Sequence, residues 1–331
     1  MKRKIKVLYI VFSVIALSLA LCSIFSILRN TESRYLKMLD FPRIQLFIAL
    51  FICLLLFVVA LKRWKWYDYM LSSLMLLGLI INGSYLIHYT RLVSVEVPFA
   101  EKVVATDTKV SLLITNVKMT NRNAQDLHKL IALKQPDLIL AMEVDKWWDT
   151  NLKVLKNDYP YSQHTTNAVT YGMVVYSKLP LNNLVVHYLN NKNVPSFEST
   201  ITLESGKQIK FYSVHPVPPT HFKDLPDNAG QEENALKNLG KKISEQKLPV
   251  IVAGDLNEVV WSYVDELTGT KNVLYDVRVG RGFYNSYNAE NPFMRWPLDH
   301  IFVTKEFKLK RLERLSKMGS DHFPILVELV L

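Results

Sequence analysis

Three long apolar runs occupy most of the first hundred residues. Residues 7–28 and 44–61 contain no charged side chain, and residues 69–90 are interrupted only by polar groups such as Asn82 and His88. At about 1.5 Å per residue, each run is long enough to cross a hydrocarbon core of about 30 Å as a helix. The pattern predicts a membrane anchor over residues 1–100, with transmembrane helices at about 7–28, 44–61 and 69–90. We expect no charged partner for Asn82 or His88 in the other helices, so we interpret them as helix-contact or interfacial residues rather than as a polar path.

Positive charges flank these runs unevenly. The start Met1-Lys2-Arg3-Lys4 also resembles a signal peptide, but the apolar run that follows is longer than a signal-peptide core, so we expect a retained helix. Lys and Arg in short flanks favour the cytoplasm. The chain start and the second loop carry Lys2, Arg3, Lys4, Lys6, Lys62, Arg63 and Lys65, whereas the first loop carries Arg29, Arg34, Lys37 and Arg43. Three crossings then place the C-terminal part of the chain outside the cytoplasm.

From Lys109 onwards the pattern changes to short β-rich runs separated by helical ones. Strands are predicted at Val110–Val117, Asp137–Val144, Gly172–Tyr176, Leu184–Tyr188, Glu198–Leu203, Ile209–His215, Val250–Asp255, Asp299–Val303 and Ile325–Leu329, and helices at Asn123–Lys134, Asp145–Leu155 and Gln231–Ser244. The turn Ser205-Gly206 between two of these strands is typical of an antiparallel hairpin, which excludes a uniform βαβ series. The pattern therefore predicts an α/β domain over residues 101–331, a four-layer sandwich of two packed mixed β-sheets flanked by helices.

The positive charge of the chain is concentrated in the predicted anchor. The formal net charge is +10; residues 1–100 hold 12 Lys or Arg against 4 Asp or Glu, and residues 101–331 hold 28 against 26. The C-terminal domain is therefore close to neutral, which weakens the case for a clamp on long polyanions such as duplex DNA. Cys22 and Cys53 both lie in the apolar runs, so the domain can hold neither a disulfide framework nor a Cys-based zinc site.

Acids, amides and histidines follow the apolar strand runs of this domain, where side chains can converge on one cleft. They are Asn116, Glu143, His215, Asp255, Asn257, Asp299, His300, Asp321 and His322. Taken singly, an Asp or Asn after a strand is more often a turn former or a helix N-cap. Glu143 is harder to explain in this way, because a carboxylate after the apolar run Leu138–Met142 is costly unless it is paired or bound to a metal.

The order of these residues resembles the motif order of the endonuclease/exonuclease/phosphatase superfamily. That superfamily has an Asn after the first strand, a metal-binding Glu after the second, a His, a Gly-Asp-x-Asn, an Asp-His before a strand and a terminal Ser-Asp-His. The matching residues are Asn116, Glu143, His215, Gly254-Asp255-Leu256-Asn257, Asp299-His300 and Ser320-Asp321-His322, over roughly Lys109 to Leu331. The three predicted helices and the segments His215–Pro219 and Arg278–Phe283 resemble a bacterial membrane-bound branch of it.

The resemblance implies hydrolysis of phosphoester bonds with Mg²⁺, with Mn²⁺ as the alternative ion. Hard oxygen ligands suit Mg²⁺, and Glu143 is then its principal ligand, assisted by Asn116, with Asp321 close by. Asp255 orients and deprotonates the attacking water. Asn257 hydrogen-bonds the nucleophile or the phosphate.

The histidines receive roles from the same resemblance. His322 stabilises the phosphoryl oxygens as an imidazolium that Asp299 keeps charged. His215 lies near the leaving-group oxygen, and His300 is a weaker candidate for a catalyst. A Gly- and aromatic-rich stretch just before the predicted strand Asp299–Val303 contains Arg278, Arg281 and Arg295. Their guanidinium groups either determine specificity by gripping a second phosphate or an anionic head group, or tie a structural loop to backbone carbonyls. The loop Thr220–Gly230, with Asp224 and Asp227, is either a lid or a disordered insertion.

Together these features predict a membrane-anchored, Mg²⁺-dependent phosphoesterase whose catalytic domain faces out of the cytoplasm. A lipid or small phosphoester is favoured as substrate, because the domain is near neutral and tethered beside a bilayer. An extracytoplasmic nuclease is the alternative, and a catalytically silent binding module on the same fold is the third hypothesis. The sequence indicates no protein partner.

Overall fold

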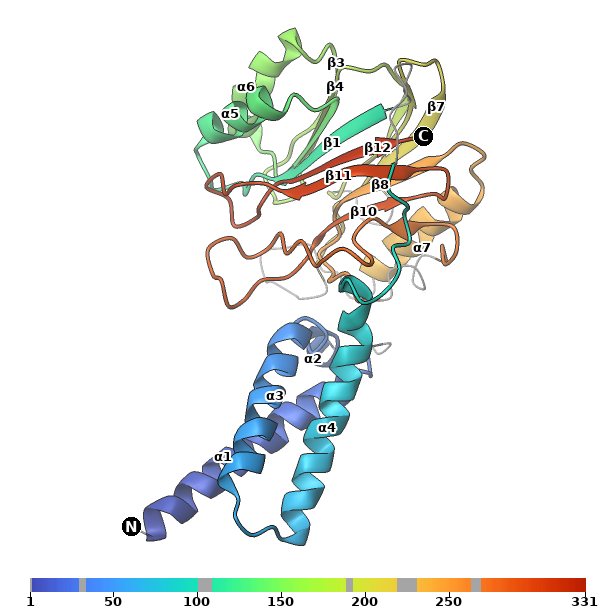
Figure 1. Cartoon of the computed structure of the whole chain (residues 1–331). Coiled ribbons are helices and arrows are strands. Elements are labelled where there is room, and N and C mark those ends of the chain that lie inside the picture. Colours follow the sequence, from blue (N-terminus) through green and yellow to red (C-terminus); the bar gives the residue numbers. More distant parts are fainter. Residues whose placement is uncertain (1, 30–33, 101–108, 189–192, 219–230, 263–268) are drawn as a thin grey trace. The chain divides into compact units, whose positions relative to one another are not determined.

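The computed structural model describes residues 2–29, 34–100, 109–188, 193–218, 231–262 and 269–331. The chain divides into two compact units, Met1–Val93 and Ser94–Leu331. Figure 1 shows a helical N-terminal unit and a C-terminal unit built mainly from strands.

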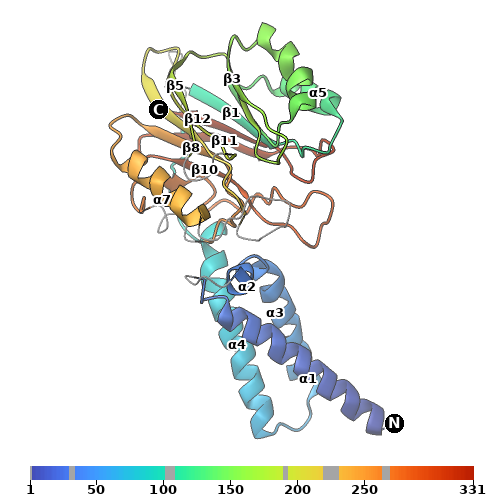
Figure 2. The ribbon, with the colours of Figure 1, turned by 180° about the vertical axis from the view of Figure 1, so that it is seen from behind.

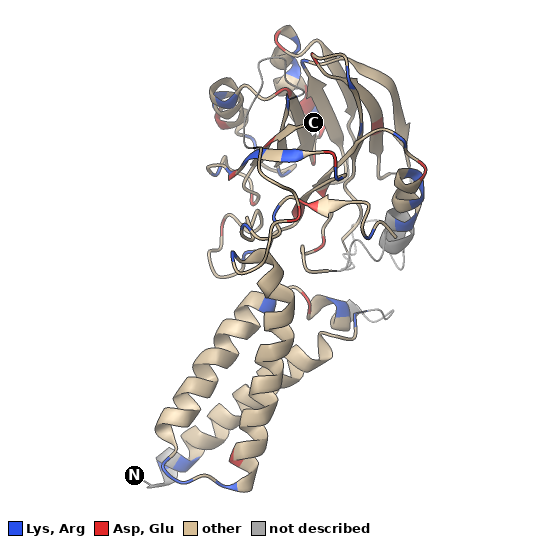
Figure 3. Ribbon diagram, turned by 45° about the vertical axis from the view of Figure 1, so that its right-hand side comes forward, with Lys and Arg blue, Asp and Glu red and all other residues tan. Residues whose placement is uncertain are grey.

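The N-terminal unit contains three long helices. They are α1 (Lys2–Phe25), α3 (Arg43–Ala60) and α4 (Trp66–Leu86), with the short α2 (Arg34–Met38) and a 3-10 turn (Ile87–Tyr89) beside them. The segments long and apolar enough to cross a membrane are Lys6–Phe25, Arg43–Ala60 and Trp66–Tyr89. Figure 3 shows that Lys and Arg of these helices gather near their ends, which leaves long uncharged stretches between. The three apolar helices predicted from the sequence are therefore present.

A buried polar cluster joins the three long helices. Asn82 of α4 donates to Ser23 Oγ (2.9 Å) and accepts from Arg43 Nη1 (3.3 Å), and the Arg43 guanidinium lies 3.7 Å from the centre of the Tyr85 ring. Asp40 in turn forms ion pairs with Arg29 and Arg43. The expectation that Asn82 lacks a charged partner was wrong, because Arg43, counted as a loop residue, is the first residue of α3 and turns into the bundle. The interpretation of Asn82 as a helix-contact residue fits these contacts.

The C-terminal unit contains two mixed six-stranded sheets. The first has the order β11 (Lys308–Arg314), β12 (Ile325–Val330), β1 (Lys109–Asn116), β2 (Leu138–Met142), β4 (Met173–Ser177) and β3 (Tyr161–Thr165). The second has the order β5 (Leu181–His187), β6 (Ser196–Thr202), β7 (Gln208–Ser213), β8 (Val250–Asp255), β10 (Asp299–Val303) and β9 (Tyr275–Asp276). The pairs β1–β2 and β7–β8 are parallel and the other ladders are antiparallel, which confirms the predicted mixed sheets.

Helices cover the outer faces of both sheets. Helices α5 (Ala124–Lys134) and α6 (Lys146–Leu152) lie on the first sheet, and α7 (Gln231–Ser244) lies on the second, as Figure 2 shows from behind. Side chains alternate along each strand, so Leu112 and Ile114 of β1 face the core between the sheets, whereas Leu113 faces the helices. The four layers are thus helix, sheet, sheet and helix, as predicted.

The sequence pattern did not predict strands β3, β9 and β11. All three lie at the edge of a sheet, where one side of the backbone ladder has no partner strand. Strand β11 reads Lys-Leu-Lys-Arg-Leu-Glu-Arg and strand β3 reads Tyr-Ser-Gln-His-Thr, so neither contains an apolar run. Edge strands are commonly polar, because charge there prevents pairing with other chains. Their assignment therefore depends on the neighbouring strand rather than on their own sequence.

Candidate active site

Two carboxylates meet because two antiparallel strands pair in register. Asp255 ends β8, Asp299 begins β10, and these residues lie directly opposite each other. Such pairs place their Cβ atoms about 4.5–5.5 Å apart. The residue before Asp255 must be glycine: Gly254 has φ +150°, and a Cβ there would lie 1.8 Å from the carbonyl oxygen of Val214. This close approach explains why the acid is preceded by Gly254.

A second acidic position comes from the first sheet. Asn116 ends β1, and Glu143 directly follows β2, its parallel neighbour. Asn116 Nδ2 donates to Glu143 Oε1 (2.9 Å) and to Asp255 Oδ2 (3.1 Å), so one amide connects acids that belong to different sheets. Glu143 (φ 60°) and Asn257 (φ 54°) both adopt left-handed backbone conformations. Such conformations cost about 1–3 kcal/mol in a non-glycine residue and are concentrated at functional sites.

His322 lies between Asp299 and Asp255. Its Nδ1 donates to Asp299 Oδ2 (2.8 Å), and its Nε2 lies 3.5 Å from Asp255 Oδ2. The ligand atoms of these three buried residues all lie within 4.8 Å of one another. Ser320 positions the histidine, because its Oγ accepts from the His322 N–H (3.0 Å) and donates to the carbonyl of Asn116 (2.7 Å).

The charges of this group are strongly coupled. Burial lowers the pKa of His322, but the neighbouring carboxylates Asp299 and Asp255 outweigh burial and raise it to about 10. Burial raises the pKa of Asp299, yet the His322 charge and hydrogen bond hold it below its usual range. Burial also raises the pKa of Asp255, and here the His322 charge only partly opposes it. His322 is therefore an imidazolium held by the ionised Asp299, and Asp255 is the more basic of the two carboxylates.

His215 completes the group from the segment after β7. Its Nε2 lies 3.9 Å from Asp255 Oδ2, and its ring centre lies 5.4 Å from that of Tyr171. The side chain is buried, and burial lowers its pKa. Asn257 Nδ2 donates to the carbonyl of Pro216 (2.9 Å), and the Asn257 N–H donates to Asp255 Oδ1 (2.9 Å). The Gly-Asp-x-Asn motif and His215 are thus placed against each other.

The oxygen donors around Glu143 fit a hard divalent cation. Glu143 is half-buried, and burial raises its pKa against the hydrogen bonds of Asn116 and Met119. Among the described residues, no Lys or Arg forms an ion pair with this carboxylate. A cation beside Glu143 would favour its ionised form. Asp321 lies close to Glu143, and its Oδ2 lies 3.4 Å from Lys118 Nζ. The prediction that Asn116, Glu143 and Asp321 hold the metal stays a prediction.

Four further candidates, the three arginines of the stretch before β10 and His300 within β10, separate into two kinds. Arg278 is buried; it pairs with Asp276 (2.9 Å) and donates to the carbonyl of Asp299 (2.9 Å). Arg281 donates to the carbonyls of Val97 and Val277 and packs on the Phe99 ring. His300 Nε2 donates to the carbonyl of Glu258 (2.7 Å) inside the core. These contacts favour the structural-loop alternative for Arg278 and Arg281. They leave His300 outside the candidate catalytic group, which comprises Asn116, Glu143, His215, Asp255, Asp299 and His322.

Arg295 lies near the candidate catalytic residues. Its Nε donates to the carbonyl of Asn288 (3.1 Å), and its guanidinium lies over the ring of Phe323, the residue after His322. It stays our candidate for substrate binding. The loop Thr220–Gly230, with Asp224 and Asp227, lies outside the described residues.

Sequence reasoning missed several residues around the group. Ser286 Oγ accepts from the Asp299 N–H (3.1 Å), the ring centre of Tyr287 lies 5.0 Å from that of His322, and Lys118 Nζ lies between Asp321 and Glu290 (3.4 and 3.5 Å). Burial lowers the pKa of Lys118, but Asp321 and Glu290 outweigh burial and raise it. Lys118 lies two residues after Asn116, which was the one available signal. Ser286 and Tyr287 come from a loop without any hydrophobic pattern.

Solved structures resemble this fold at low sequence identity. D. rerio TDP2 complexed with single strand DNA product is 19% identical, with a TM-score of 0.56, over 67% of this chain and 99% of that chain. An endonuclease/exonuclease/phosphatase family protein from Bacteroides thetaiotaomicron is 18% identical, with a TM-score of 0.51, over 68% and 95%. One from Beutenbergia cavernae is 15% identical, with a TM-score of 0.52, over 67% and 72%. These likenesses show the fold alone.

The family assignment comes from the sequence span that carries the site. No curated protein sequence matches this chain. Residues 114–322 match the Endonuclease/Exonuclease/phosphatase family, and this span runs from β1 to His322 and covers more than half of the chain. Members of this family generally hydrolyse phosphoester bonds. The chain therefore belongs to the endonuclease/exonuclease/phosphatase family.

Proposed function

We propose that this chain is a membrane-anchored, Mg²⁺-dependent phosphoesterase that acts outside the cytoplasm. The observation that carries the proposal is one group of side chains from two sheets, Asn116, Glu143, Asp255, Asp299 and His322, joined by hydrogen bonds and by the ion pair of His322 with Asp255. Phosphoester hydrolysis needs neutralised phosphoryl oxygens, an oriented water and a protonated leaving group. This group together with the neighbouring His215 offers a candidate side chain for each need.

Mg²⁺ bound at Glu143, with Asn116 and Asp321, would supply charge neutralisation at the phosphoryl oxygens. The fit rests on the donor types and on the half-buried Glu143 carboxylate described above. Asn116 already orients that carboxylate through its amide (2.9 Å), a supporting contact of the kind that tunes metal sites. Mn²⁺ accepts the same oxygen donors.

Asp255 is our candidate for the general base. Its carboxylate is fixed by the amide of Asn116 (3.1 Å) and the N–H of Asn257 (2.9 Å). Because burial raises its pKa, Asp255 accepts a proton from water more readily than an ordinary aspartate does. Asn257 lies beside it to hydrogen-bond the water or the phosphate.

His322 is our candidate for the fixed positive charge beside the phosphate. Its imidazolium is held by Asp299 (2.8 Å), so it is already oriented before a substrate arrives. A pre-oriented charge in a buried site stabilises developing negative charge at little reorganisation cost. His215 is assigned to the leaving-group side, where its Nε2 lies 3.9 Å from Asp255.

The side chains around the group favour an amphiphilic or small phosphoester. Phe293 and Met294 are 82% and 42% exposed and directly precede Arg295, which places apolar surface next to a cation. This arrangement suits a phosphate attached to an apolar group. The near-neutral charge of the domain is consistent with it, because long polyanions need many cationic contacts.

The decisive experiment compares Glu143→Gln with the matched control Glu306→Gln, which changes an exposed glutamate outside the site. Each full-length protein is purified in detergent, and its thermal stability is measured with and without Mg²⁺ at constant ionic strength. At about a hundredfold excess over the dissociation constant, a bound ion stabilises the folded state by about 2.7 kcal/mol. We expect this gain in the parent and in Glu306→Gln but not in Glu143→Gln. No gain in any of the three proteins would count against the metal site.

Hydrolysis of a panel of phospholipid, sugar-phosphate and nucleic-acid substrates is then measured with the same proteins and with Asp255→Asn. We expect Mg²⁺-dependent activity in the parent and in the control only. A folded parent that Mg²⁺ stabilises but that cleaves no substrate would favour the catalytically silent binding module.

An extracytoplasmic nuclease is the second candidate, because a protein of similar fold, D. rerio TDP2, was crystallised with single strand DNA product. DNA cleavage that falls steeply with added salt would favour this candidate. The orientation is tested separately with reporters fused after Leu331 in a bacterial host. A reporter that is active only in the cytoplasm would refute the outside placement.

A further inference from the structure

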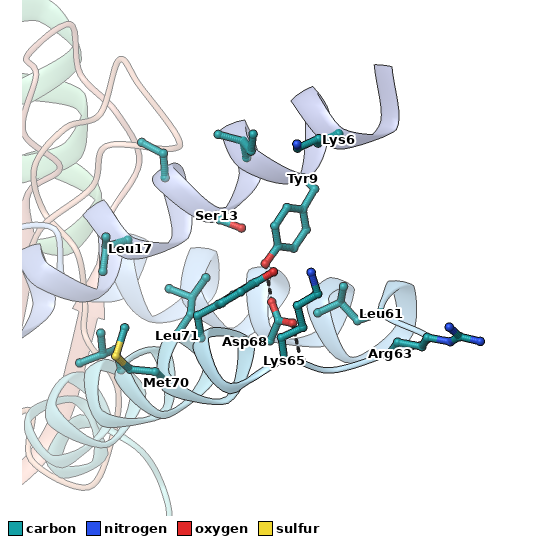
Figure 4. Close-up of a pocket in the computed structure, with 14 residues that line it drawn as sticks. Lys6, Tyr9, Ser13, Leu17, Leu61, Arg63, Lys65, Asp68, Met70 and Leu71 are labelled. Atoms are coloured by element: carbon teal, nitrogen blue, oxygen red, sulfur yellow. Dashed lines mark hydrogen bonds between the residues drawn. The ribbon is translucent and has the colours of Figure 1, made fainter. Parts of the chain in front are cut away.

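A cavity lies between α1 and α4 of the helical unit, beside the loop that joins α3 to α4. Its volume is about 640 Å³, within the range of about 300–1,000 Å³ that is usual for ligand pockets. Figure 4 shows Tyr9 of α1 and Asp68 of α4 pointing toward each other, with Lys6 above Tyr9 on α1 and Lys65 beside Asp68. No residue of the candidate catalytic group lines this cavity.

The lining of the cavity has two chemically different parts. One part is apolar and lies within the predicted membrane spans: Ile10, Val14, Leu17, Met70, Leu71 and Leu74. The other part lies at the end of the spans and carries the cations Lys6, Arg63 and Lys65. A pocket with cations at the membrane boundary and apolar walls within the bilayer matches the two parts of a phospholipid.

The one acidic side chain in the lining, Asp68, is engaged by neutral donors, and Lys65 Nζ lies 5.5 Å from the centre of the Tyr67 ring. Asp68 accepts from the Tyr9 hydroxyl and from the Lys65 N–H (2.8 Å). In the part of the chain that the structure describes, neither Lys6, Arg63 nor Lys65 forms an ion pair. The cavity therefore has an excess of positive charge where a phosphate would lie.

We propose that this cavity binds one anionic phospholipid, with its phosphate beside Lys6 and Lys65 and an acyl chain along α1 and α4. Each cation near an anionic lipid surface contributes about 1 kcal/mol, which corresponds to about fivefold in affinity. The inference is independent of the proposed catalytic function. It requires that the three helices lie in a bilayer.

The test measures lipid retention by the intact chain. Full-length protein in detergent is titrated with phosphatidylglycerol or phosphatidylcholine, and bound lipid is counted by native mass spectrometry. We expect one phosphatidylglycerol to be retained in preference to phosphatidylcholine. We also expect that water-soluble glycerol 3-phosphate does not displace it, because it lacks the acyl chain. Equal retention of the two lipids, or displacement by glycerol 3-phosphate, would overturn the proposal.

Matched variants separate the site from general surface charge. The double variant Lys6→Gln/Lys65→Gln is expected to weaken phosphatidylglycerol retention by about 25-fold, or about fivefold per cation. The control Lys4→Gln/Lys62→Gln removes the same charge from α1 and from the same loop, but these residues do not line the cavity. We expect the control to change retention by less than about threefold, because exposed charges are screened by salt. An equal loss in both double variants would show general electrostatic attraction and refute a specific site.

A charge-neutral variant guards against misfolding as the cause. Val14→Trp fills the apolar part of the cavity and leaves every cation in place. We expect it to lower retention of phosphatidylglycerol while helicity measured by circular dichroism stays unchanged. Unchanged lipid retention in a folded Val14→Trp protein would contradict an acyl chain in this cavity.

Discussion

The substitution Asp299→Asn tests the charge network of the candidate catalytic group. In the parent, His322 Nδ1 donates to Asp299 Oδ2 (2.8 Å), and the neighbouring carboxylates raise the pKa of His322 from 6.5 to about 10. At about 1.36 kcal/mol per pKa unit, this preference for the imidazolium is worth about 5 kcal/mol. Asparagine keeps the hydrogen-bond acceptor but removes the negative charge, so the pKa of His322 should fall toward its ordinary value.

The assay is the pH dependence of kcat/KM with Mg²⁺ on a phosphoester that the parent hydrolyses. The parent should keep the imidazolium up to a pH near 10, whereas the variant should lose it at a lower pH, because one of the carboxylates that favour the charged ring is gone. At mildly alkaline pH we expect activity to fall about 10²–10³-fold, the usual effect of removing one transition-state stabiliser. The loss should be smaller in mildly acidic solution, where His322 is charged in both proteins.

Stability provides the second readout for the same variant. A histidine whose folded-state pKa is raised contributes stability below its unfolded pKa of about 6.5 and loses it as the pH rises through the folded value. The parent should therefore lose stability between pH 6.5 and about 10, and the Asp299→Asn protein should lose less over this range.

The matched control is Asp149→Asn, which removes the carboxylate of a different Asp–His pair, Asp149 with His164, outside the catalytic group. We expect the control to keep the parental pH profile. An Asp299→Asn protein that is folded and keeps the parental alkaline limit of activity would refute the coupling of His322 to Asp299.

Three further substitutions test how the fold supports the site. Burial and the nearby Arg278 lower the pKa of His300 to about 3, so its contribution to stability is complete above about pH 6.5 and is lost as the pH falls toward 3. His300→Gln should reduce this loss of stability in acid, measured by urea unfolding at several pH values, and an unchanged loss would contradict a neutral buried His300. Gly254→Ala places a Cβ 1.8 Å from the Val214 carbonyl oxygen and should destabilise the fold by about 3 kcal/mol or more. The control Gly206→Ala, whose Cβ would meet nothing within 4 Å, should lose less stability, and equal losses would argue against the close approach. Arg278→Met leaves Asp276 buried without its partner and should lower stability by about 3–5 kcal/mol, and the double variant Arg278→Met/Asp276→Asn should recover part of this loss. Normal stability of Arg278→Met with a raised KM would instead indicate that Arg278 binds substrate.

Local sequence pattern was sufficient to predict most of the elements. The three apolar helices could be predicted because membrane-spanning length and absence of charge are properties of one continuous segment. The buried strands β1, β2 and β8 could be predicted for the same reason, since each is a short apolar run. Strands β3 and β11 could not, because a polar edge strand resembles a loop until its neighbour is known.

The order of the polar motifs was likewise contained in the sequence, and it led to the family. Only the tertiary structure decided which of those residues meet. The contact of Asn116 with both Glu143 and Asp255 needs two sheets to pack together, and the register of β8 with β10 places Asp255 opposite Asp299. Such pairings join residues far apart in the chain, so no local pattern records them.

The same distinction separates the arginines of one stretch. The sequence around Arg278 and Arg295 does not distinguish a structural from a substrate-binding arginine. In the structure, Arg278 is buried against Asp276, whereas Arg295 lies beside Phe323, next to the candidate catalytic group. In the helical unit, Arg43 turned from an expected loop cation into the partner of Asn82. The sequence determined where charge and apolar length lie along the chain. The packing of distant segments decided which charges are neutralised inside the protein and which remain available, because ion pairing and burial depend on neighbours in space.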